Sequence, residues 1–231
     1  AAGDRLMPDH KGYGISRADI IIEAIFEDAD VKRELYQSIE PRMKADAILA
    51  TNTSSIRLED LSSALAQPGR LVGLHFFNPV AKMPLVEIVY ENETDSGEVE
   101  RGAAFANHIN RFPLLVRSSP GFLVNRVLGR YMLNAFRIHL ERSIPKEAID
   151  LAAEQFGMPM GPVELADTVG LDVGMNVLAT LGGEDAARES ELLKSLVDEG
   201  KLGKKSGEGF YTWEKGRAKK DKSAAEGVNL D

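Results

Sequence analysis

The sequence of 231 residues contains no cysteine, which excludes disulfide bonds, thiolate metal sites and cysteine nucleophiles. Basic residues are outnumbered by acidic ones: 28 Lys and Arg against 36 Asp and Glu give a net charge of -8. Nucleic-acid binding requires a basic face. No apolar run approaches the roughly 18 residues of a membrane span, and no signal-peptide pattern opens the sequence. We therefore expect neither a nucleic-acid partner nor a membrane span, and we predict no metal ligands.

The composition that remains, with 43% hydrophobic and 28% charged residues, is typical of a globular protein with a real core. Strands are predicted at residues 19–26, 46–55, 70–77, 84–90 and 112–119, and helices at 28–43, 55–69 and 98–110. The first strand is predicted to be buried, and Val31, Leu35 and Ile39 are predicted to line one face of the first helix. This alternation indicates an α/β fold around a mostly parallel sheet.

After "SSPG" at residues 118–121 the pattern becomes helical. Helices are predicted at residues 122–143, 145–157, 162–183 and 189–200. The first of them carries a wide apolar stripe, made of Val124, Val127, Leu128, Tyr131, Met132, Ala135 and Phe136. We therefore expect an α/β domain at residues 1–117 and an all-helical domain at 118–231. The polar end of the helical domain, residues 214–231, is interpreted as a solvated tail or linker.

A lone histidine and a lone carboxylate interrupt two apolar runs: His75 in "RLVGLHFF" and Glu87 in "PLVEIVY". An imidazole can accept a proton near neutral pH, and a carboxylate on its other nitrogen would fix its tautomer. The two residues, on neighbouring strands, are therefore candidates for such a pair. Ligands of an α/β sheet bind beyond the carboxyl ends of its strands. Three further hydrogen-bonding side chains are predicted to meet the pair at these ends, namely Ser54, Asn78 and Asn125.

Each of these side chains also has a purely structural interpretation. His75 could be a satisfied residue at a strand end, and Glu87 could lie on the solvent face of an edge strand. The "TNTSS" stretch could be a polar turn that caps a helix, and Asn125 could face water. The remaining histidines are interpreted as structural or surface residues, namely His10, His108 and His139.

Five motifs in one order make the chain similar to a known family: "NTSS", "GLHFFNPVAKMPLVEIV", "SPGFLVNR", "GMPMGPVELADTVGLD" and "LGKKSGEGFY". Together, from about residue 19 to residue 213, they resemble the L-3-hydroxyacyl-CoA dehydrogenases. That family oxidises the 3-hydroxyl of an acyl-CoA to a ketone and passes a hydride to NAD. The resemblance implies NAD as the cofactor, acyl-CoA as the substrate, and a Rossmann-like domain followed by a helical domain.

The resemblance also implies a role for individual residues. His75 corresponds to the catalytic base of the family and Glu87 to its partner. Ser54 corresponds to a serine that hydrogen-bonds the reacting oxygen, and Asn125 to an asparagine that places the substrate at the domain boundary. The positions that correspond to cofactor-lining residues are Ala24, Ile25, Glu27, Lys32, Asn52 and Asn78.

The glycine pattern departs from that of the family. Its opening strand, GxGxxG turn and acidic ribose ligand have no counterpart here. The stretch "GYGISR" precedes a strand instead of following one, and "GKLGKKSGEG" lacks the spacing of a phosphate-binding loop. We therefore expect an incomplete Rossmann-like domain that joins the family pattern near its middle. Expected partners are a second copy of the chain or further domains of a multifunctional fatty-acid oxidation protein. A bacterial cytoplasm is the expected location, or a mitochondrion or peroxisome for a eukaryotic chain.

A rival hypothesis makes the chain a non-catalytic acyl-CoA-binding or oligomerisation module of a larger assembly. A purely structural module has no need of the set formed by His75, Glu87, Ser54 and Asn125. An excised fragment of an enzyme would retain this set without being active. The two hypotheses therefore merge if the parent polypeptide is an enzyme and this fragment is not, and a strand with a GxGxxG turn ahead of this stretch in the parent would decide between them.

Overall fold

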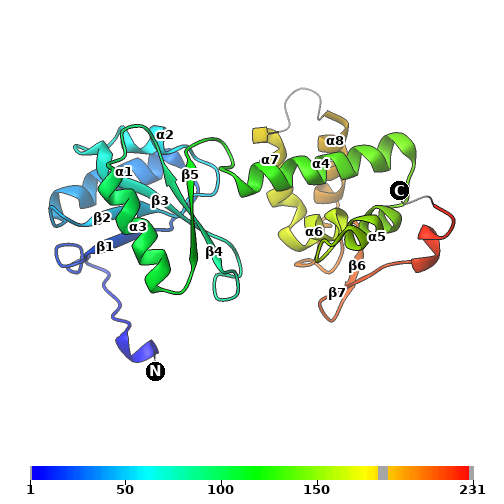
Figure 1. Cartoon of the computed structure of the whole chain (residues 1–231), viewed down its shortest axis with the longest axis horizontal. Helices are drawn as coiled ribbons and strands as arrows, with labels where there is room; N and C mark the ends of the chain where they lie inside the picture. Colours follow the sequence, from blue (N-terminus) through cyan, green and yellow to red (C-terminus); the bar gives the residue numbers. More distant parts are fainter. Residues whose placement is uncertain (1, 182–186, 229–231) are drawn as a thin grey trace. The chain divides into compact units, whose positions relative to one another are not determined.

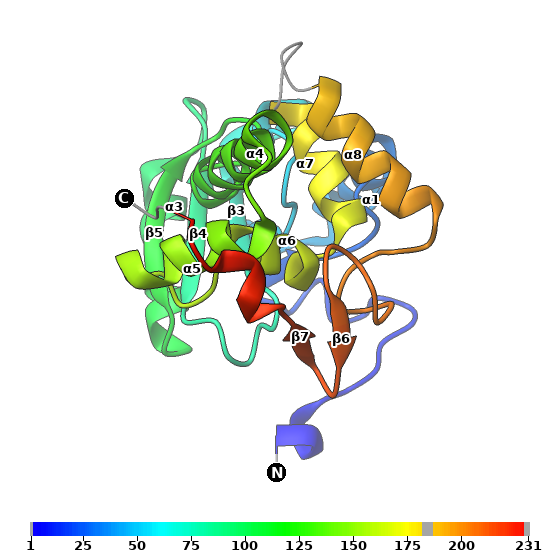
Figure 2. The same cartoon turned by 90° about the vertical axis from the view of Figure 1, so that its right-hand side faces the viewer.

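The computed structural model describes residues 2–181 and 187–228. The chain divides into two compact units, Ala1–Phe122 and Leu123–Asp231. The first is an α/β unit and the second is mainly helical (Figures 1 and 2). The predicted order, an α/β domain followed by a helical domain, is confirmed.

A five-stranded sheet forms the centre of the first unit (Figure 1). In spatial order its strands are β1 (Ile20–Glu23), β2 (Ile48–Thr51), β3 (Leu71–Phe76), β4 (Leu85–Tyr90) and β5 (Phe112–Arg117). The neighbours are parallel except for β3 and β4, which are antiparallel. The mostly parallel sheet is therefore confirmed. Since β5 is parallel to β4, both strands run opposite to the first three.

Helices cover both faces of this sheet. α1 (Ala29–Ile39) and α2 (Leu58–Ser62) pack on one face, and α3 (Ser96–His108) packs on the other. Each face has its own apolar core. The core under α1 and α2 is built from Tyr36, Ile39, Leu49, Leu58, Leu61, Leu65, Leu71, Val89, Val116 and Phe122. The core under α3 is built from Ile48, Ala50, Val72, Leu74, Val86, Ile88, Val99 and Ala106. Short 3-10 segments occupy Ala2–Arg5, Glu40–Arg42 and Pro68–Arg70.

The buried face of α1 differs from the predicted one. Val31 is 43% exposed, whereas Lys32 and Tyr36 are buried together with Ile39. The reason is a set of polar contacts. Lys32 and Tyr36 both bind the carboxylate of Glu23, which is itself buried at the end of β1. Apolar spacing predicts the rotation of a helix only when no buried charge competes for the same face.

The first strand was predicted to be buried, and this is wrong. In the described part of the chain β1 is an edge strand that pairs only with β2, and Ile22 is 39% exposed. Nearby apolar side chains are also exposed, with Ile25 at 41% and Phe26 at 85%. An apolar run of four to eight residues predicts a strand but not its place in the sheet.

Five helices make up most of the described part of the second unit: α4 (Val124–Arg142), α5 (Lys146–Phe156), α6 (Pro162–Val169), α7 (Leu171–Leu181) and α8 (Ala187–Asp198). The predicted helix at 162–183 is two helices, because Gly170 adopts φ 107 between them. Its last two residues lie outside the described part of the chain. Gly157 ends α5, as predicted, with φ 114.

The described part of the C-terminal stretch, which ends at residue 228, is not the solvated tail that was predicted, and residues 229–231 of that prediction lie outside the described residues. β6 (Thr212–Glu214) and β7 (Arg217–Lys219) form a hairpin, and a 3-10 segment follows at Lys222–Ala225. The ammonium of Lys220 lies 3.3 Å from Asp150 and 2.7 Å from both Glu154 and Glu164. Since these carboxylates belong to α5 and α6, Lys220 fastens the end of the hairpin to the helices, whereas Lys215, Arg217 and Lys219 remain exposed.

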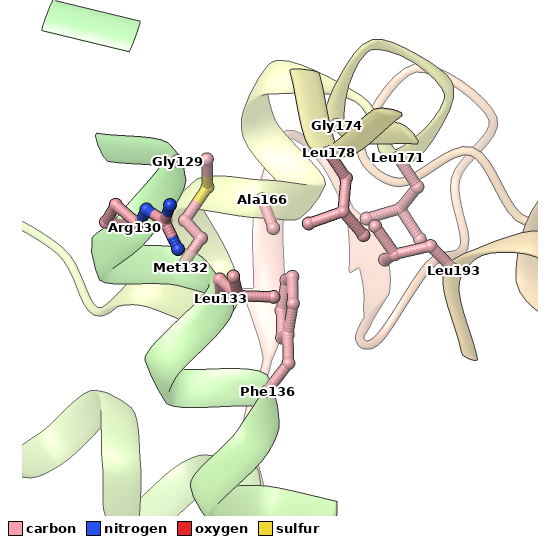
Figure 3. A pocket seen from close by; sticks show the side chains of 10 residues that line it. All are labelled: Gly129, Arg130, Met132, Leu133, Phe136, Ala166, Leu171, Gly174, Leu178 and Leu193. Carbon is pink, nitrogen blue, oxygen red and sulfur yellow. The ribbon is translucent and has the colours of Figure 1, made fainter. Parts of the chain in front are cut away.

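Side chains from α4, α6, α7 and α8 converge on a narrow apolar cavity of about 20 Å³ in the core of the helical unit (Figure 3). The cavity is lined by Gly129, Arg130, Met132, Leu133, Phe136, Ala166, Leu171, Gly174, Leu178 and Leu193. A space of this size holds about one water or methyl group, so this core is closely packed.

None of the described helices combines the length and apolarity needed to cross a bilayer.

Candidate active site

His75 and Glu87 face each other across two adjacent strands. They are directly opposite residues in the antiparallel register of β3 and β4. Nδ1 of the imidazole lies 2.7 Å from Oε2 of the carboxylate, and the two side chains are 7% and 0% exposed. The contact expected between the two side chains on neighbouring strands is confirmed. The alternative that placed Glu87 on a solvent face is wrong.

The surroundings of His75 hold the imidazole in one orientation. The ring of Phe77 lies 4.5 Å from it, centroid to centroid, and that of Phe122 lies 5.5 Å away in an edge-on arrangement. A carboxylate only accepts hydrogen bonds, so the imidazole must carry its proton on Nδ1, the nitrogen that faces Glu87. Nε2 of the neutral ring is then a proton acceptor. The pair has the geometry of a general base with a fixed tautomer.

Ser54 lies on a turn that follows β2 and is held by Glu27. One oxygen of Glu27 accepts hydrogen bonds from the Thr53 hydroxyl at 2.6 Å and from the Ser54 amide at 2.8 Å. The Ser54 hydroxyl lies 3.3 Å from the same oxygen. Burial favours the protonated form of Glu27, but these hydrogen bonds and the charge of Lys32 outweigh it and lower the pKa of the carboxyl. Glu27 is therefore an anion that organises the turn.

Several of the residues predicted to line the cofactor follow the carboxyl ends of β1 and β2. Ala24 and Ile25 follow the strand directly and are exposed. Asn52 follows β2, and its side-chain oxygen accepts the Phe76 amide of β3 at 3.0 Å. Lys32 differs from the others because its side chain is only 1% exposed and its ammonium binds Glu23. Some of the residues predicted to line the cofactor therefore form an exposed surface, and one of them belongs to an internal ion pair.

The two predicted asparagines lie apart along the chain. Asn78 is exposed in the loop after β3 and precedes a cis peptide bond to Pro79. Asn125 lies in the first turn of α4, in the helical unit. The 118–121 stretch was predicted to follow a strand that ends at the same edge of the sheet as the strand before Ser54. This is wrong, because β5 runs opposite to β2 and β3, so its carboxyl end lies at the other edge. Phe122 nevertheless reaches the ring of His75.

Comparison with known proteins identifies the family of this chain. Residues 4–119 match the model of a protein family described as "3-hydroxyacyl-CoA dehydrogenase, NAD binding domain". Residues 121–213 match the model described as "3-hydroxyacyl-CoA dehydrogenase, C-terminal domain". The chain belongs to the 3-hydroxyacyl-CoA dehydrogenase family. The resemblance read from the five motifs is thereby confirmed, and so is NAD as the cofactor of the family.

Relatives of several lengths share this similarity. The chain is 41% identical over 216 residues to a Caenorhabditis elegans protein named "Probable 3-hydroxyacyl-CoA dehydrogenase", covering 91% of this chain and 70% of that protein. It is 37% identical over 214 residues to the fatty acid oxidation complex subunit alpha of Vibrio campbellii, covering 92% of this chain and 30% of that protein. The chain therefore spans about 30% of the length of such subunits.

A solved structure supports the same relationship. The crystal structure of 3-hydroxybutyryl-CoA dehydrogenase from Escherichia coli is similar with a TM-score of 0.84 at 36% identity. The match covers 94% of this chain and 47% of that one. The likeness therefore extends over both units of the chain.

The residues present fit NAD in part. The edge formed by Ala24, Ile25 and Asn52 lies at the carboxyl ends of parallel strands, where nucleotide cofactors of α/β folds bind. The exposed apolar surface after β1 suits the flat face of a nicotinamide ring. The 231 residues contain no GxGxxG turn after a strand, so they fit the nicotinamide half better than the pyrophosphate.

Sequence reasoning overlooked Glu23, which is buried and binds four donors. Its signal was nevertheless present, because "IIIEAI" places one carboxylate in an apolar run just as "LVEIV" does with Glu87. Another overlooked residue is Asp167, whose carboxylate accepts the Tyr211 amide and the Trp213 indole N–H, each at 2.9 Å. Burial raises the pKa of Asp167 although these hydrogen bonds oppose the rise. Within the glycine-rich 200–209 stretch, a Cβ at Gly203 would meet the Asp167 backbone and one at Gly209 would meet the Asp167 carboxylate, while Gly200 and Gly207 adopt positive φ, so these glycines have a structural reason that involves no phosphate.

Proposed function

We propose that the protein carrying this chain oxidises (S)-3-hydroxyacyl-CoA to 3-oxoacyl-CoA with NAD, as a step of fatty-acid β-oxidation. The observation that carries the proposal is the buried contact of 2.7 Å between His75 and Glu87, at the centre of a fold that belongs to this dehydrogenase family. A purely structural role would not require a buried imidazole to keep one nitrogen available as an acceptor.

The chemistry assigned to His75 is removal of the proton from the 3-hydroxyl. Nε2 accepts this proton while Nδ1 remains hydrogen-bonded to Glu87. The imidazolium that forms lies beside the carboxylate, which stabilises its positive charge in a site that water reaches poorly. The carbonyl forms as the hydrogen on C3 leaves with its electron pair. NAD, when bound, supplies the acceptor for this hydride.

Two further side chains are assigned to the substrate. Ser54 donates its hydroxyl to the reacting oxygen, and Glu27 holds the turn from which it does so. Asn125, in the first turn of α4, helps to orient the acyl-CoA. The cofactor-lining roles are assigned to Ala24, Ile25, Glu27, Lys32, Asn52 and Asn78. The exposure of Ala24, Ile25 and Asn78 supports this assignment for the nicotinamide side, whereas Lys32 is buried against Glu23 and has only its position beside Glu27 in support.

The experiment that tests the function is an assay of the full-length polypeptide with (S)-3-hydroxybutyryl-CoA and NAD, followed by the absorbance of NADH. We expect turnover with this enantiomer and little with the (R) form. His75→Gln should lose the activity while still binding acyl-CoA. Wild-type protein that binds acyl-CoA without forming NADH would contradict the proposal and favour the rival hypothesis of a non-catalytic module.

A second copy of the chain is the partner that we propose for the helical unit. A hollow of about 390 Å³ is lined by Val127, Leu128, Tyr131, Ala153, Phe156 and Met158 on one side of α4 and α5. Phe156 is 90% exposed and Val127 is 59% exposed. An apolar face of this kind is usually covered in a symmetric dimer. The similarity to the longer Vibrio subunit supports further domains as additional partners.

The cellular location is part of the same proposal. Oxidation of acyl-CoA esters is expected in the cytoplasm if the chain is bacterial, and in mitochondria or peroxisomes if it is eukaryotic. Support comes from the bacterial alpha subunits among the relatives. Fractionation of the source cells, with the dehydrogenase activity as the marker, tests this location.

A further inference from the structure

A buried carboxylate that the proposed chemistry does not use lies at the end of β1. Glu23 is 3% exposed and accepts hydrogen bonds from the segment after β1, from α1 and from β2. Its Oε1 accepts the Ile25 amide and the Lys32 ammonium, each at 2.7 Å. Its Oε2 accepts the Tyr36 hydroxyl at 2.9 Å and the Thr51 hydroxyl at 2.8 Å. Glu23 therefore joins three parts of the sheet edge at which the predicted site lies.

Lys32 extends this contact to the turn that carries Ser54. Its ammonium lies 2.7 Å from Glu23 and 3.5 Å from Oε2 of Glu27. The other oxygen of Glu27 accepts the Thr53 hydroxyl and the Ser54 amide. Because Lys32 is 1% exposed, its charge interacts with these two carboxylates and hardly with water. The contacts run without a break from Glu23 through Lys32 and Glu27 to Ser54.

We infer that Glu23 is a positioning residue that acts on Ser54 through Lys32 and Glu27. The inference rests on the proposed function, in which the Ser54 hydroxyl meets the reacting oxygen. While Glu23 neutralises Lys32, Glu27 keeps one oxygen on the turn. Without the charge of Glu23, Lys32 pairs with Glu27 alone and draws it away from that turn. A displacement of about 1 Å at a reacting group can lower a rate about a hundredfold.

The test is Glu23→Gln in the full-length polypeptide, assayed with (S)-3-hydroxybutyryl-CoA at saturating NAD. The amide has the same size, and its one oxygen can accept the hydrogen bonds from Tyr36 and Thr51, but its NH2 group then faces Lys32 and the Ile25 amide and neither accepts from them nor neutralises the ammonium. We expect kcat to fall about 10- to 100-fold. KM for the acyl-CoA should change little, because the ester as a whole is bound by other groups.

The matched control is Tyr36→Phe. This variant removes one donor from the same carboxylate and leaves the ion pair between Glu23 and Lys32 in place. It should lower the melting temperature without a comparable loss of kcat. A fall in kcat that matched that of Glu23→Gln would mean that disturbance of the buried cluster alone is responsible, and would overturn the inference.

A double-mutant cycle with Ser54→Ala provides the readout that a structural role would not change. If Glu23 acts through Ser54, Glu23→Gln should cost little once the serine hydroxyl is absent. Additive losses would overturn the inference, as would a folded Glu23→Gln variant with normal kcat. If Glu23→Gln does not fold, Lys32→Met in the same cycle decides, because it removes the middle of the chain of contacts. Its coupling to Ser54 would support the inference and its additivity would overturn it.

Wild-type turnover is measured first, so that the two proposals can fail separately. Absence of wild-type turnover overturns the proposed function and this inference with it. Normal wild-type turnover with no coupling between Glu23 and Ser54 overturns this inference alone.

Discussion

His75 and Glu87 are directly opposite residues of the β3–β4 ladder, with Nδ1 and Oε2 2.7 Å apart. Side chains at directly opposite positions lie on the same face of a sheet with their Cβ atoms about 5 Å apart. The backbone register of two buried strands therefore brings the imidazole and the carboxylate together, and no loop has to close to form the pair. A base built in this way is positioned before substrate arrives.

Replacement of the base should affect turnover far more than binding. His75→Gln is expected to lower kcat by about 10²–10⁴, the usual contribution of a positioned general base. His139→Gln is the control, because that imidazole binds the Ile144 carbonyl in the helical unit. Steady-state assays of NADH formation, together with acyl-CoA titrations, check the prediction. Near-normal turnover of His75→Gln would remove the basis for the assignment.

Glu87 should act only through the imidazole. Glu87→Gln keeps the shape of the side chain but replaces the charged acceptor that faces Nδ1. We expect a reduced kcat, and in the double variant with His75→Gln a loss close to that of His75→Gln alone. Multiplicative losses in the four-corner cycle would show that the two residues do not work as a pair.

The catalytic pair could be predicted from the sequence because its signal is local. A single titratable residue in each of two short apolar runs identifies both His75 and Glu87, and adjacent β-runs are good candidates for pairing. The same logic applied to "IIIEAI" would have found Glu23 as well. What no single run contains is the place of a strand in the sheet. The reversed direction of β5 therefore escaped prediction.

The C-terminal hairpin escaped prediction for a different reason. A polar stretch rich in lysine is usually solvated, and only its partners distinguish the exceptions. Lys220 binds Asp150, Glu154 and Glu164, which are 56 to 70 positions away in the sequence. Lone carboxylates in amphipathic helices are common, so nothing local marks these three as the acceptors of a distant lysine.

The turn that carries Ser54 should weaken in acid because of Glu27. The folded state lowers the pKa of this carboxyl below its ordinary value of 4.5, so the folded state binds a proton less readily than the unfolded chain. The stabilisation is therefore complete above that value and is lost as the pH falls through the lower, folded pKa. Melting temperatures between about pH 6 and pH 3 should fall more steeply for wild type than for Glu27→Gln. Glu34→Gln, an exposed change on α1, should follow wild type.

The apolar face of α4 and α5 should determine the oligomeric state. Phe156→Glu places a charge on a side chain that is 90% exposed in the single chain and that would be buried in the proposed dimer. Sedimentation should be measured at tens of micromolar, a concentration at which interfaces of ordinary size persist. It should show a dimer for wild type and a monomer for the variant. Val173→Asp, on α7, is the matched control and should remain dimeric. A strictly monomeric wild type would contradict the proposal.

The 231 residues expressed by themselves should bind acyl-CoA and NAD with different affinities. Dinucleotide affinity depends largely on pyrophosphate contacts with a glycine turn at a helix N-terminus and on an acidic ribose ligand. Neither motif occurs in this stretch, and the surface around Ala24 and Asn52 suits only the nicotinamide side. We therefore expect calorimetric titration to detect acetoacetyl-CoA weakly and NAD hardly at all, without turnover. Micromolar NAD binding with hydride transfer would show that the pyrophosphate can be held without the glycine turn. Silence towards both ligands would instead favour a non-catalytic module, since a site that binds neither substrate nor cofactor gives the buried base nothing to act on.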